Sequence, residues 1–382
     1  MAKVKAESLK ELRRRRSAKW RAFEADVLPL PVAEMDFPIA KPIQDELIDM
    51  IRRSDLGYGG FIPELPRAFA NYAKTHWNWD IDTEQFRLAT DVGVAGVEVL
   101  RLVTQPGDKV VINSPVYLNF FTWISEVKCE AVDVPLISAG SEWALDATAL
   151  EAAFADGAKA YILCHPHNPV GHVYSRTELE RIAELAEKYD VLVISDEIHA
   201  PLTFKEANFI PYLAVNDVAR KHGVCITSAS KSWNLAGLKC AQIVSQDPDV
   251  NELLSQLPVS TSWRASILGG WASVVAYNDG QAWLDSVMKN LDANRHYLER
   301  LVKKYLPKAK YSIPRSTYLA WIDLRAYELE KPADILHEKA RIALSHGEDF
   351  GTPGIGHVRL NFATSKANLK AAIKRIAEVL ED

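Results

Sequence analysis

The sequence contains little cysteine, and this scarcity narrows the class of protein. Four cysteines occur among 382 residues, and none shows the C-x-x-C spacing of many metal and redox motifs. They are Cys129, Cys164, Cys225 and Cys240. This density does not support a disulfide framework, so we expect small buried apolar side chains in a cytoplasmic protein.

Long apolar runs are missing as well. No run approaches the roughly 20 residues that a membrane-spanning helix needs. The chain is charged from Lys3 onward, without the apolar core of a secretory signal. The sequence therefore predicts no membrane partner.

Neither positive nor negative charge is in strong excess in the sequence. The chain has 45 basic and 50 acidic residues, a net charge of −5, which gives no general attraction to nucleic acid. One basic run occupies residues 13–21, within a helix predicted over 5–22. Because Glu7, Glu11 and Glu24 dilute it, we expect a solvated helix face and no nucleic-acid partner.

One catalytic pattern is absent and another is incomplete. The chain has no G-x-S-x-G, the nucleophile turn of many hydrolases. Four histidines lie near Cys164 in the sequence, namely His165, His167, His172 and His199. His-Pro-His in a proline turn is not a standard ligand frame for zinc, so no metal is predicted.

A regular alternation of apolar strands and helices begins at residue 86. It favours an α/β fold with a mostly parallel sheet that is covered on both faces. The predicted strands are 86–90, 109–113, 129–134, 158–164, 191–195 and 224–226, with helices at 150–154 and 176–189.

The two ends of the chain predict a second, smaller α+β domain. A long helix over 271–296 leads into short strands at 318–322 and 358–362 and helices at 333–341 and 366–380. The proline-rich stretch 27–38 is extended and is expected to join this domain. The predicted division is 1–45, an N-terminal segment joining the small domain, 46–284, the large domain, and 285–382, the small domain.

Polar side chains follow four of the predicted strands. Tyr117, Asn168, Asp196 and Lys231 come at or just after strand ends, which meet at one edge of a parallel sheet. A lysine that forms an imine, a carboxylate, an amide donor and an aromatic face suit a phosphate-bearing pyridine aldehyde. Taken singly, each has a plainer interpretation: Lys231 as a turn lysine, Asp196 as a helix cap, Asn168 as a turn residue.

Four motifs in this order resemble one family. They are Asn-Pro-Val-Gly at 168–171, Ser-Asp-Glu-Ile-His at 195–199, Ser-Ala-Ser-Lys at 228–231 and Val-Arg-Leu-Asn-Phe at 358–362. Together they resemble the fold type I pyridoxal-phosphate enzymes of the class I/II aminotransferase superfamily. The stretches 32–37, 57–59, 231–239 and 343–351 are similar to its MalY/PatB branch of cystathionine β-lyase-type C–S lyases.

The resemblance implies a role for each candidate residue. Lys231 is the imine-forming lysine and general base, and Asp196 pairs with the pyridine nitrogen. Asn168 and His199 lie near the ring hydroxyl, Tyr117 stacks on the ring, and Arg359 binds the substrate carboxylate with Asn168. The phosphate is bound by the backbone amides of Val94 and Ala95 and by Ser228, Ser230 and Lys239. Tyr58 reaches the partner's site in a homodimer, as a further catalytic and substrate-binding residue.

The implied reaction is elimination from an S-substituted cysteine such as L-cystathionine, which gives pyruvate, ammonia and a thiol. Many aminotransferases have tyrosine where His199 stands, which speaks against simple transamination. An aminotransferase stays an alternative because the two reactions share an intermediate, and so does a regulatory role through protein contact. The natural thiol and the preference for β- or γ-elimination stay open, although the pocket for the substrate side chain is expected near 34–37.

Overall fold

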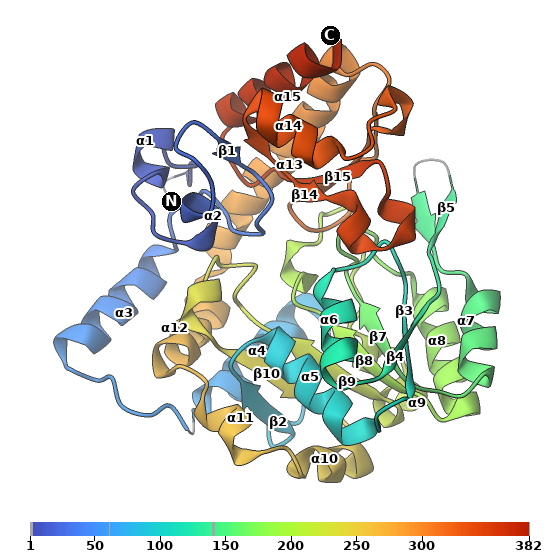
Figure 1. The fold of residues 1–382 in the computed structure, drawn as a ribbon. Coiled ribbons are helices and arrows are strands. Elements are labelled where there is room, and N and C mark those ends of the chain that lie inside the picture. Colours follow the sequence, from blue (N-terminus) through green and yellow to red (C-terminus); the bar gives the residue numbers. More distant parts are fainter. Residues whose placement is uncertain (1–2, 61, 140–141, 382) are drawn as a thin grey trace.

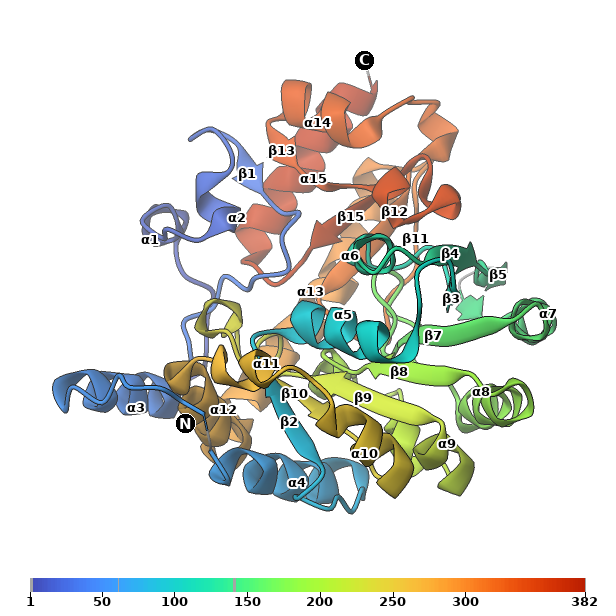
Figure 2. The same ribbon diagram turned by 60° about the horizontal axis from the view of Figure 1, so that its bottom comes forward.

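A seven-stranded sheet forms the centre of the large domain (Figures 1 and 2). This computed structural model describes residues 3–60, 62–139 and 142–381. Six strands are parallel and β10 runs antiparallel to both of its neighbours, which confirms the mostly parallel sheet. The order is β2 (Phe86–Ala89), β10 (Ala241–Val244), β9 (Gly223–Thr227), β8 (Leu192–Asp196), β7 (Ala158–Cys164), β3 (Lys109–Ile112) and β4 (Glu130–Asp133).

The central strands are apolar at nearly every position because both faces of the sheet are covered. Successive side chains point to opposite faces. Ile162 and Ile194 pack into a core with α5 (Val92–Val103) and α6 (Asn119–Glu126). Leu163 and Val193 pack into the other core, with α8 (Arg176–Tyr189).

The remaining helices of the large domain surround this sheet. Helix α8 begins where Ser175 and Glu178 form a capping box, as the Ser-x-x-Glu spacing favours. The others are α3 (Lys41–Arg52), α4 (Glu64–Trp77), α7 (Ala147–Ala155), α9 (Asp217–Lys221), α10 (Pro248–Ser255), α11 (Val259–Trp263) and α12 (Ile267–Asp279). Short pieces complete it: β5 (Ile137–Ala139), β6 (Glu142–Ala144) and the 3-10 turns η1 (Ala200–Leu202), η2 (Tyr212–Ala214) and η3 (Ala236–Leu238).

The small domain is built from both ends of the chain, as expected. A four-stranded antiparallel sheet has the order β11 (Lys310–Tyr311), β12 (Leu319–Asp323), β15 (His357–Asn361) and β14 (Ser345–His346). Its helices and turns are α13 (Gln281–Tyr305), α14 (Pro332–Ala340), α15 (Lys366–Glu381), η4 (Arg325–Tyr327), η5 (Gly347–Phe350) and η6 (Thr352–Gly354).

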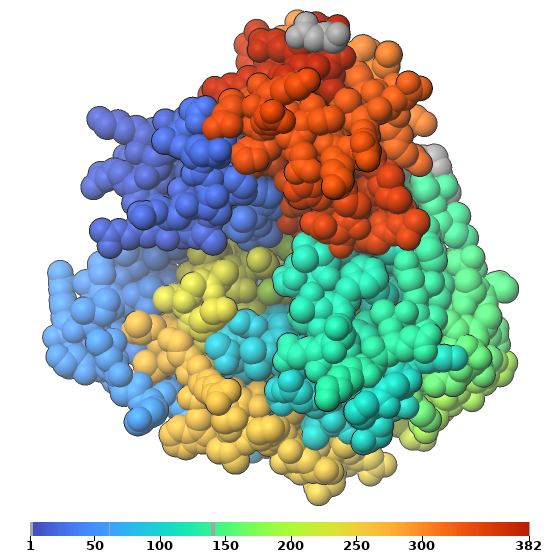
Figure 3. Space-filling view, viewed as in Figure 1, coloured from blue at the N-terminus to red at the C-terminus, as the bar shows by residue number. Residues whose placement is uncertain are grey.

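The N-terminal segment joins this domain through a short parallel strand pair. Strand β1 (Leu28–Pro29) pairs with β13 (Ile342–Ala343). In the space-filling view the blue N-terminal residues and the orange-red C-terminal residues lie side by side above the large domain (Figure 3). The domain boundaries at 45/46 and 284/285 stay predictions, although α13 begins close to the second one.

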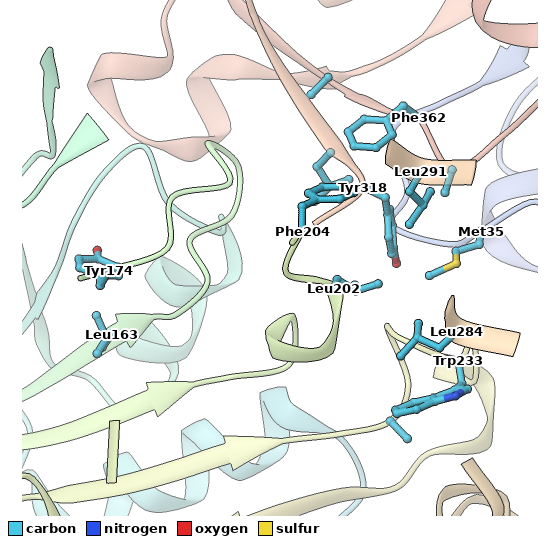
Figure 4. Packing of buried hydrophobic residues seen from close by; sticks show 14 of the residues in the cluster. Met35, Leu163, Tyr174, Leu202, Phe204, Trp233, Leu284, Leu291, Tyr318 and Phe362 are labelled. Atoms are coloured by element: carbon cyan, nitrogen blue, oxygen red, sulfur yellow. The ribbon is translucent and has the colours of Figure 1, made fainter. Parts of the chain in front are cut away.

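Two predicted helices are wrong in extent. The helix expected over 271–296 is two helices, α12 and α13, which meet at Gly280. A side chain there would collide with the Ala276 carbonyl and the Trp233 indole, whose Nε1 donates to the Gly280 carbonyl at 3.1 Å. Figure 4 shows Trp233 beside Leu284 of α13.

The helix expected over 5–22 is two short helices, α1 (Leu9–Leu12) and α2 (Ala18–Arg21). Most of its basic run is solvated as the sequence predicts, with Arg13, Arg14, Arg16 and Arg21 exposed, but Lys19 is an exception. Lys19 is 0% exposed, and its Nζ lies 2.6 Å from Asp36 Oδ1, because the chain folds back over the extended stretch that follows. No helix in the described part of the chain is long and apolar enough to cross a membrane.

Candidate active site

The four polar residues predicted at strand ends line one cavity of about 440 Å³. Tyr117, Asn168, Asp196 and Lys231 reach it from the carboxyl ends of β3, β7, β8 and β9, which are neighbours in the sheet. His199, Ser228, Ser230, Lys239 and Arg359 line the same cavity. The fold therefore brings together nine side chains from distant parts of the chain.

Lys231 lies in the turn that follows β9. Its Nζ donates a hydrogen bond to the Ala33 carbonyl at 3.2 Å, from the extended N-terminal segment. Burial and the nearby Arg359 guanidinium lower the pKa of the Lys231 amine to about 8. A sizeable fraction of the amine is therefore neutral near physiological pH and can act as a nucleophile or base.

Asp196 ends β8 and is only 5% exposed. Its Oδ1 accepts a hydrogen bond from the Ile198 amide at 3.1 Å. Burial raises the pKa of this carboxyl to about 7, and Lys231 opposes the shift. A buried carboxylate without an ion-pair partner among the described residues is costly, and the protonated nitrogen of a pyridine ring is a cation that fits beside it.

Arg359 enters the cavity from β15 of the small domain. Its Nη1 donates to Asn168 Oδ1 at 3.0 Å, its Nη2 donates to the Pro31 carbonyl at 2.8 Å, and the Phe350 ring lies beneath the guanidinium. Burial lowers the pKa of Arg359 to about 10, so it stays a cation at neutral pH. Its Nε is buried without a hydrogen-bond partner in the described chain, which leaves a donor for a carboxylate.

His199 and Tyr117 line the cavity together with Asp196. Burial, Lys231 and Arg359 lower the pKa of His199 to about 3, so the ring is neutral, and its buried Nδ1 has no partner among the described residues. Tyr117 OH accepts from Asn119 Nδ2 at 2.6 Å, and burial raises its pKa. A neutral imidazole and an aromatic ring are compatible with a pyridine ring bound between them.

The cavity also offers hydroxyls and one ammonium. Ser228, Ser230 and Lys239 line it together with residues 90–93. Lys239 Nζ forms an ion pair of 2.8 Å with Asp91 Oδ2. Hydroxyls and a lysine beside the first turn of α5 form a suitable site for a phosphate.

The structure places Val94 and Ala95 differently from the prediction. Helix α5 starts at Val92, and neither residue lines the cavity. The Val94 amide donates to Asp91 Oδ1 and the Ala95 amide to the Asp91 carbonyl, both at 2.9 Å. These amides are therefore already engaged in capping the helix, whereas Val92 and Gly93 lie against the cavity.

Tyr58 lies apart from the cavity of its own chain. It is 88% exposed, in the turn between α3 and α4, and its ring lies 6.3 Å from that of Trp263 between centroids. Nothing in the single chain tests the role predicted for Tyr58.

Sequence reasoning missed several cavity residues. Val32 and Ala33 line the cavity, whereas the expected 34–37 does not. Ala33 acts through its carbonyl, so no side-chain pattern could reveal it. Asp91 was recognisable only as a helix cap before a glycine turn, and Trp123 only as an apolar helix residue.

The histidines near Cys164 serve other purposes. His165 and His167 are fully buried, and each contacts a backbone carbonyl, of Ile210 and Pro115 respectively. In the described part of the chain, no group of three or more His, Cys, Asp or Glu side chains could hold a metal ion.

Comparison with known proteins places the chain. The family model of aminotransferase class I and II matches residues 25–376. A cystathionine β-lyase of Corynebacterium glutamicum is 34% identical, with 97% of this chain and 99% of the relative covered. The cystathionine β-lyase PatB of Bacillus subtilis is 30% identical, with 93% of each chain covered.

A solved structure agrees with these relatives. Cystalysin from Treponema denticola, which contains a pyridoxal 5′-phosphate cofactor, superposes with a TM-score of 0.93 at 28% identity over 100% of this chain and 99% of that one. The ordered strand-end residues, the two-domain fold and these likenesses agree with one another. The chain belongs to the aminotransferase class I and II family, in the branch that contains the cystathionine β-lyases.

Proposed function

We propose that this protein is a pyridoxal-phosphate-dependent lyase that cleaves the Cβ–S bond of L-cystathionine or another S-substituted cysteine. With one water, each substrate yields a free thiol, pyruvate and ammonia. The observation that carries this proposal is the convergence of Lys231, Asp196 and Arg359 on one cavity of suitable size. Together they offer a reactive amine, a partner for a ring cation and a binding site for a carboxylate.

The residues present fit the cofactor. Bound here, pyridoxal phosphate supplies an aldehyde that joins amino groups and a cationic ring that accepts electrons. Asp196 would hold the ring nitrogen, with Asn168 and His199 near the ring hydroxyl and Tyr117 against the ring face. The phosphate would lie with Ser228, Ser230 and Lys239, next to Val92 and Gly93.

The chain's own residues position the substrate and move its proton. Arg359 binds the α-carboxylate through its guanidinium, which needs that oxygen-rich partner because its Nε has none within the described chain. Lys231 then removes the α-proton. Its pKa of about 8 makes it a base near neutral pH, and it becomes an ammonium that the Ala33 carbonyl can accept from.

A test with L-cystathionine separates this function from its alternative. We expect pyruvate and free homocysteine thiol to appear in equal amounts, with no activity in Lys231→Ala. A panel of cysteines with different S-substituents then ranks the leaving groups. An oxo acid that keeps its sulfur, formed without free thiol, would instead establish an aminotransferase.

We also propose that the enzyme works as a homodimer in the cytoplasm. Tyr58 packs edge-on against Trp263 of α11, and further exposed apolar side chains lie on the same two segments of the chain, namely Ile51, Leu56 and Val259. This apolar patch suits a second copy of the chain, and all four cysteines are unpaired, as in a reducing compartment.

Mixing two inactive variants tests the shared site. If Tyr58 serves the partner's cavity, a heterodimer of Tyr58→Ala and Lys231→Ala chains contains one intact site. Activity should then return on mixing, up to about a quarter of wild type for random pairing. A monomer by sedimentation, or no recovery in a proven heterodimer, would disprove this arrangement.

A further inference from the structure

The extended segment 31–37, which we call the strap, passes between the active site and the N-terminal helices. Each of its seven carbonyls accepts at least one hydrogen bond. The donors are Arg359 to Pro31, Asn361 to Val32, Lys231 to Ala33, Lys19 to Glu34, Arg15 to Met35, the Glu7 amide to Asp36 and Arg15 to Phe37. The backbone of the strap is thus held by hydrogen bonds along its whole length.

The inner side of the strap touches the reactive groups. Lys231 Nζ and Tyr318 OH both donate to the Ala33 carbonyl, at 3.2 and 3.0 Å. Figure 4 shows Tyr318 next to Met35 of the strap. The Ala33 carbonyl is therefore placed where it accepts from the Lys231 amine whenever that amine is free.

The outer side of the strap is held by the basic run. Lys19 Nζ donates to the Glu34 carbonyl at 3.0 Å and to Asp36 Oδ1 at 2.6 Å, and both side chains of this pair are 0% exposed. Arg15 donates to the Met35 and Phe37 carbonyls, and Ser17 Oγ donates to Glu34 Oε1 at 2.8 Å. These contacts explain a motif that the catalytic assignment leaves without a purpose.

We propose that Lys19 and Asp36 are positioning residues that act through the strap on Lys231. The Glu34 carbonyl accepts from Lys19 Nζ at 3.0 Å and from Asn361 Nδ2 at 2.7 Å, and it is one peptide away from the Ala33 carbonyl, which accepts from Lys231. A hydrogen bond that fixes the position of the Glu34 carbonyl therefore also fixes the position of the Ala33 carbonyl. The inference rests on the proposed lyase function only in that Lys231 is its base.

The strap carbonyl matters because it favours the charged form of Lys231. The charged groups that face the amine are Arg359 from β15, Asp196 from β8, Glu34 from the strap and Lys239 after η3, and neutral His199 is also near. Arg359 and Lys239 disfavour the ammonium, whereas a carbonyl acceptor stabilises it. A displaced strap removes this stabilisation just when the amine takes the substrate proton.

The decisive variant removes the pair without leaving a buried charge. In Lys19→Met/Asp36→Leu both partners become apolar, which commonly keeps or raises stability. We expect kcat for pyruvate release to fall about ten-fold, while KM stays within about two-fold because Asn168 holds Arg359 independently. The matched control is Arg16→Met, which removes an exposed cation of the same run.

A second variant and the pH profile separate positioning from stability. Arg15→Met spares the buried pair but removes a donor from the Met35 carbonyl, which keeps Asn234 Nδ2 at 3.0 Å, and from the Phe37 carbonyl, so kcat should fall about three-fold. The acidic limb of kcat, below which the Lys231 amine is protonated and cannot act as base, should move to lower pH by about half a unit in the double variant. A folded double variant with unchanged kcat and limb would overturn the proposal, as would an unchanged Arg15→Met if the double variant does not fold.

One readout does not depend on the lyase reaction. When the protein is loaded with pyridoxal phosphate alone, its visible absorbance band changes with pH as the nitrogen that joins the cofactor to Lys231 gains or loses a proton. We expect the pH midpoint of this change to move in the double variant but not in Arg16→Met. If no S-substituted cysteine yields pyruvate, the proposed function fails, and this titration still decides the role of Lys19. An unmoved midpoint would reject it.

Discussion

Two lysines lie on opposite sides of the strap, in contrasting environments. Lys19 is fully buried against the carboxylate of Asp36. Within the described residues Lys231 donates only to the Ala33 carbonyl, and burial and Arg359 lower its pKa to about 8. A lysine with a carboxylate partner holds the fold together, whereas a lysine without one is kept reactive at the expense of stability.

Replacing Lys231 gives the largest expected effect and tests the reactive side of this contrast. In Lys231→Ala, pyruvate release from L-cystathionine should fall at least about a thousand-fold, because nucleophile and base are lost together. The free energy of unfolding of the cofactor-free protein should be unchanged or higher, since a desolvated cation has gone. Retention of more than a tenth of wild-type turnover would contradict the assignment.

Replacing Lys19 tests the structural side. Lys19→Ala leaves the Asp36 carboxylate buried and unpaired, so the free energy of unfolding should drop by about 3–5 kcal/mol. The midpoint of urea unfolding measures this, with Arg16→Ala as the control. Equal midpoints for the two variants would mean that the pair does not stabilise the fold.

Asp196 extends the comparison to a buried carboxyl group, whose effect is seen in the pH dependence of stability. Its pKa of about 7 lies above the usual range, so the folded state keeps a proton that the unfolded chain loses near pH 4. The stability of the cofactor-free protein should therefore decrease as pH rises from about 4 to about 7. Asp196→Asn should remove a share of that loss on the order of 2–4 kcal/mol, although the neighbouring Glu197, with a pKa also raised to about 7 by burial, keeps some slope.

Thermal or urea unfolding of the two proteins at several pH values tests this dependence. Glu338→Gln, at an exposed position, serves as the control. An identical slope in wild type and Asp196→Asn would show that Asp196 stays ionised in the folded protein.

Asp91 provides the smallest effect, through a lysine–carboxylate pair that is partly exposed. Its carboxylate forms an ion pair with Lys239 and accepts a hydrogen bond from the Val94 amide. A bound phosphate would compete with Asp91 for both of these groups. In Asp91→Asn the dissociation constant for pyridoxal phosphate should fall a few-fold, about as much as a surface ion pair is worth. Absorbance titration measures it, with Asp80→Asn as the control, and weaker binding would contradict the expectation.

The sequence predicted the strand-end side chains because apolar strands and the polar residues after them are local signals. Lys231, Asp196 and Asn168 could be placed in this way. The break at Gly280 could not, since it depends on the indole of Trp233 from another element. The same holds for Ala33, whose carbonyl has no sequence signature. Within the basic run, the burial of Lys19 could not be predicted because it depends on Asp36, 17 residues away.

The order of strand pairing has a consequence for synthesis of the protein. Strand β2, which leads into the phosphate end of the cavity, pairs only with β10 among the described strands, and β1 pairs with β13 near the end of the chain. A chain emerging from the ribosome cannot complete either pair until the later partner has been made. The site residues that follow β2 therefore wait for residues 241–244 before this pairing can form, and those that follow β1 wait for residues 342–343, near the end of translation.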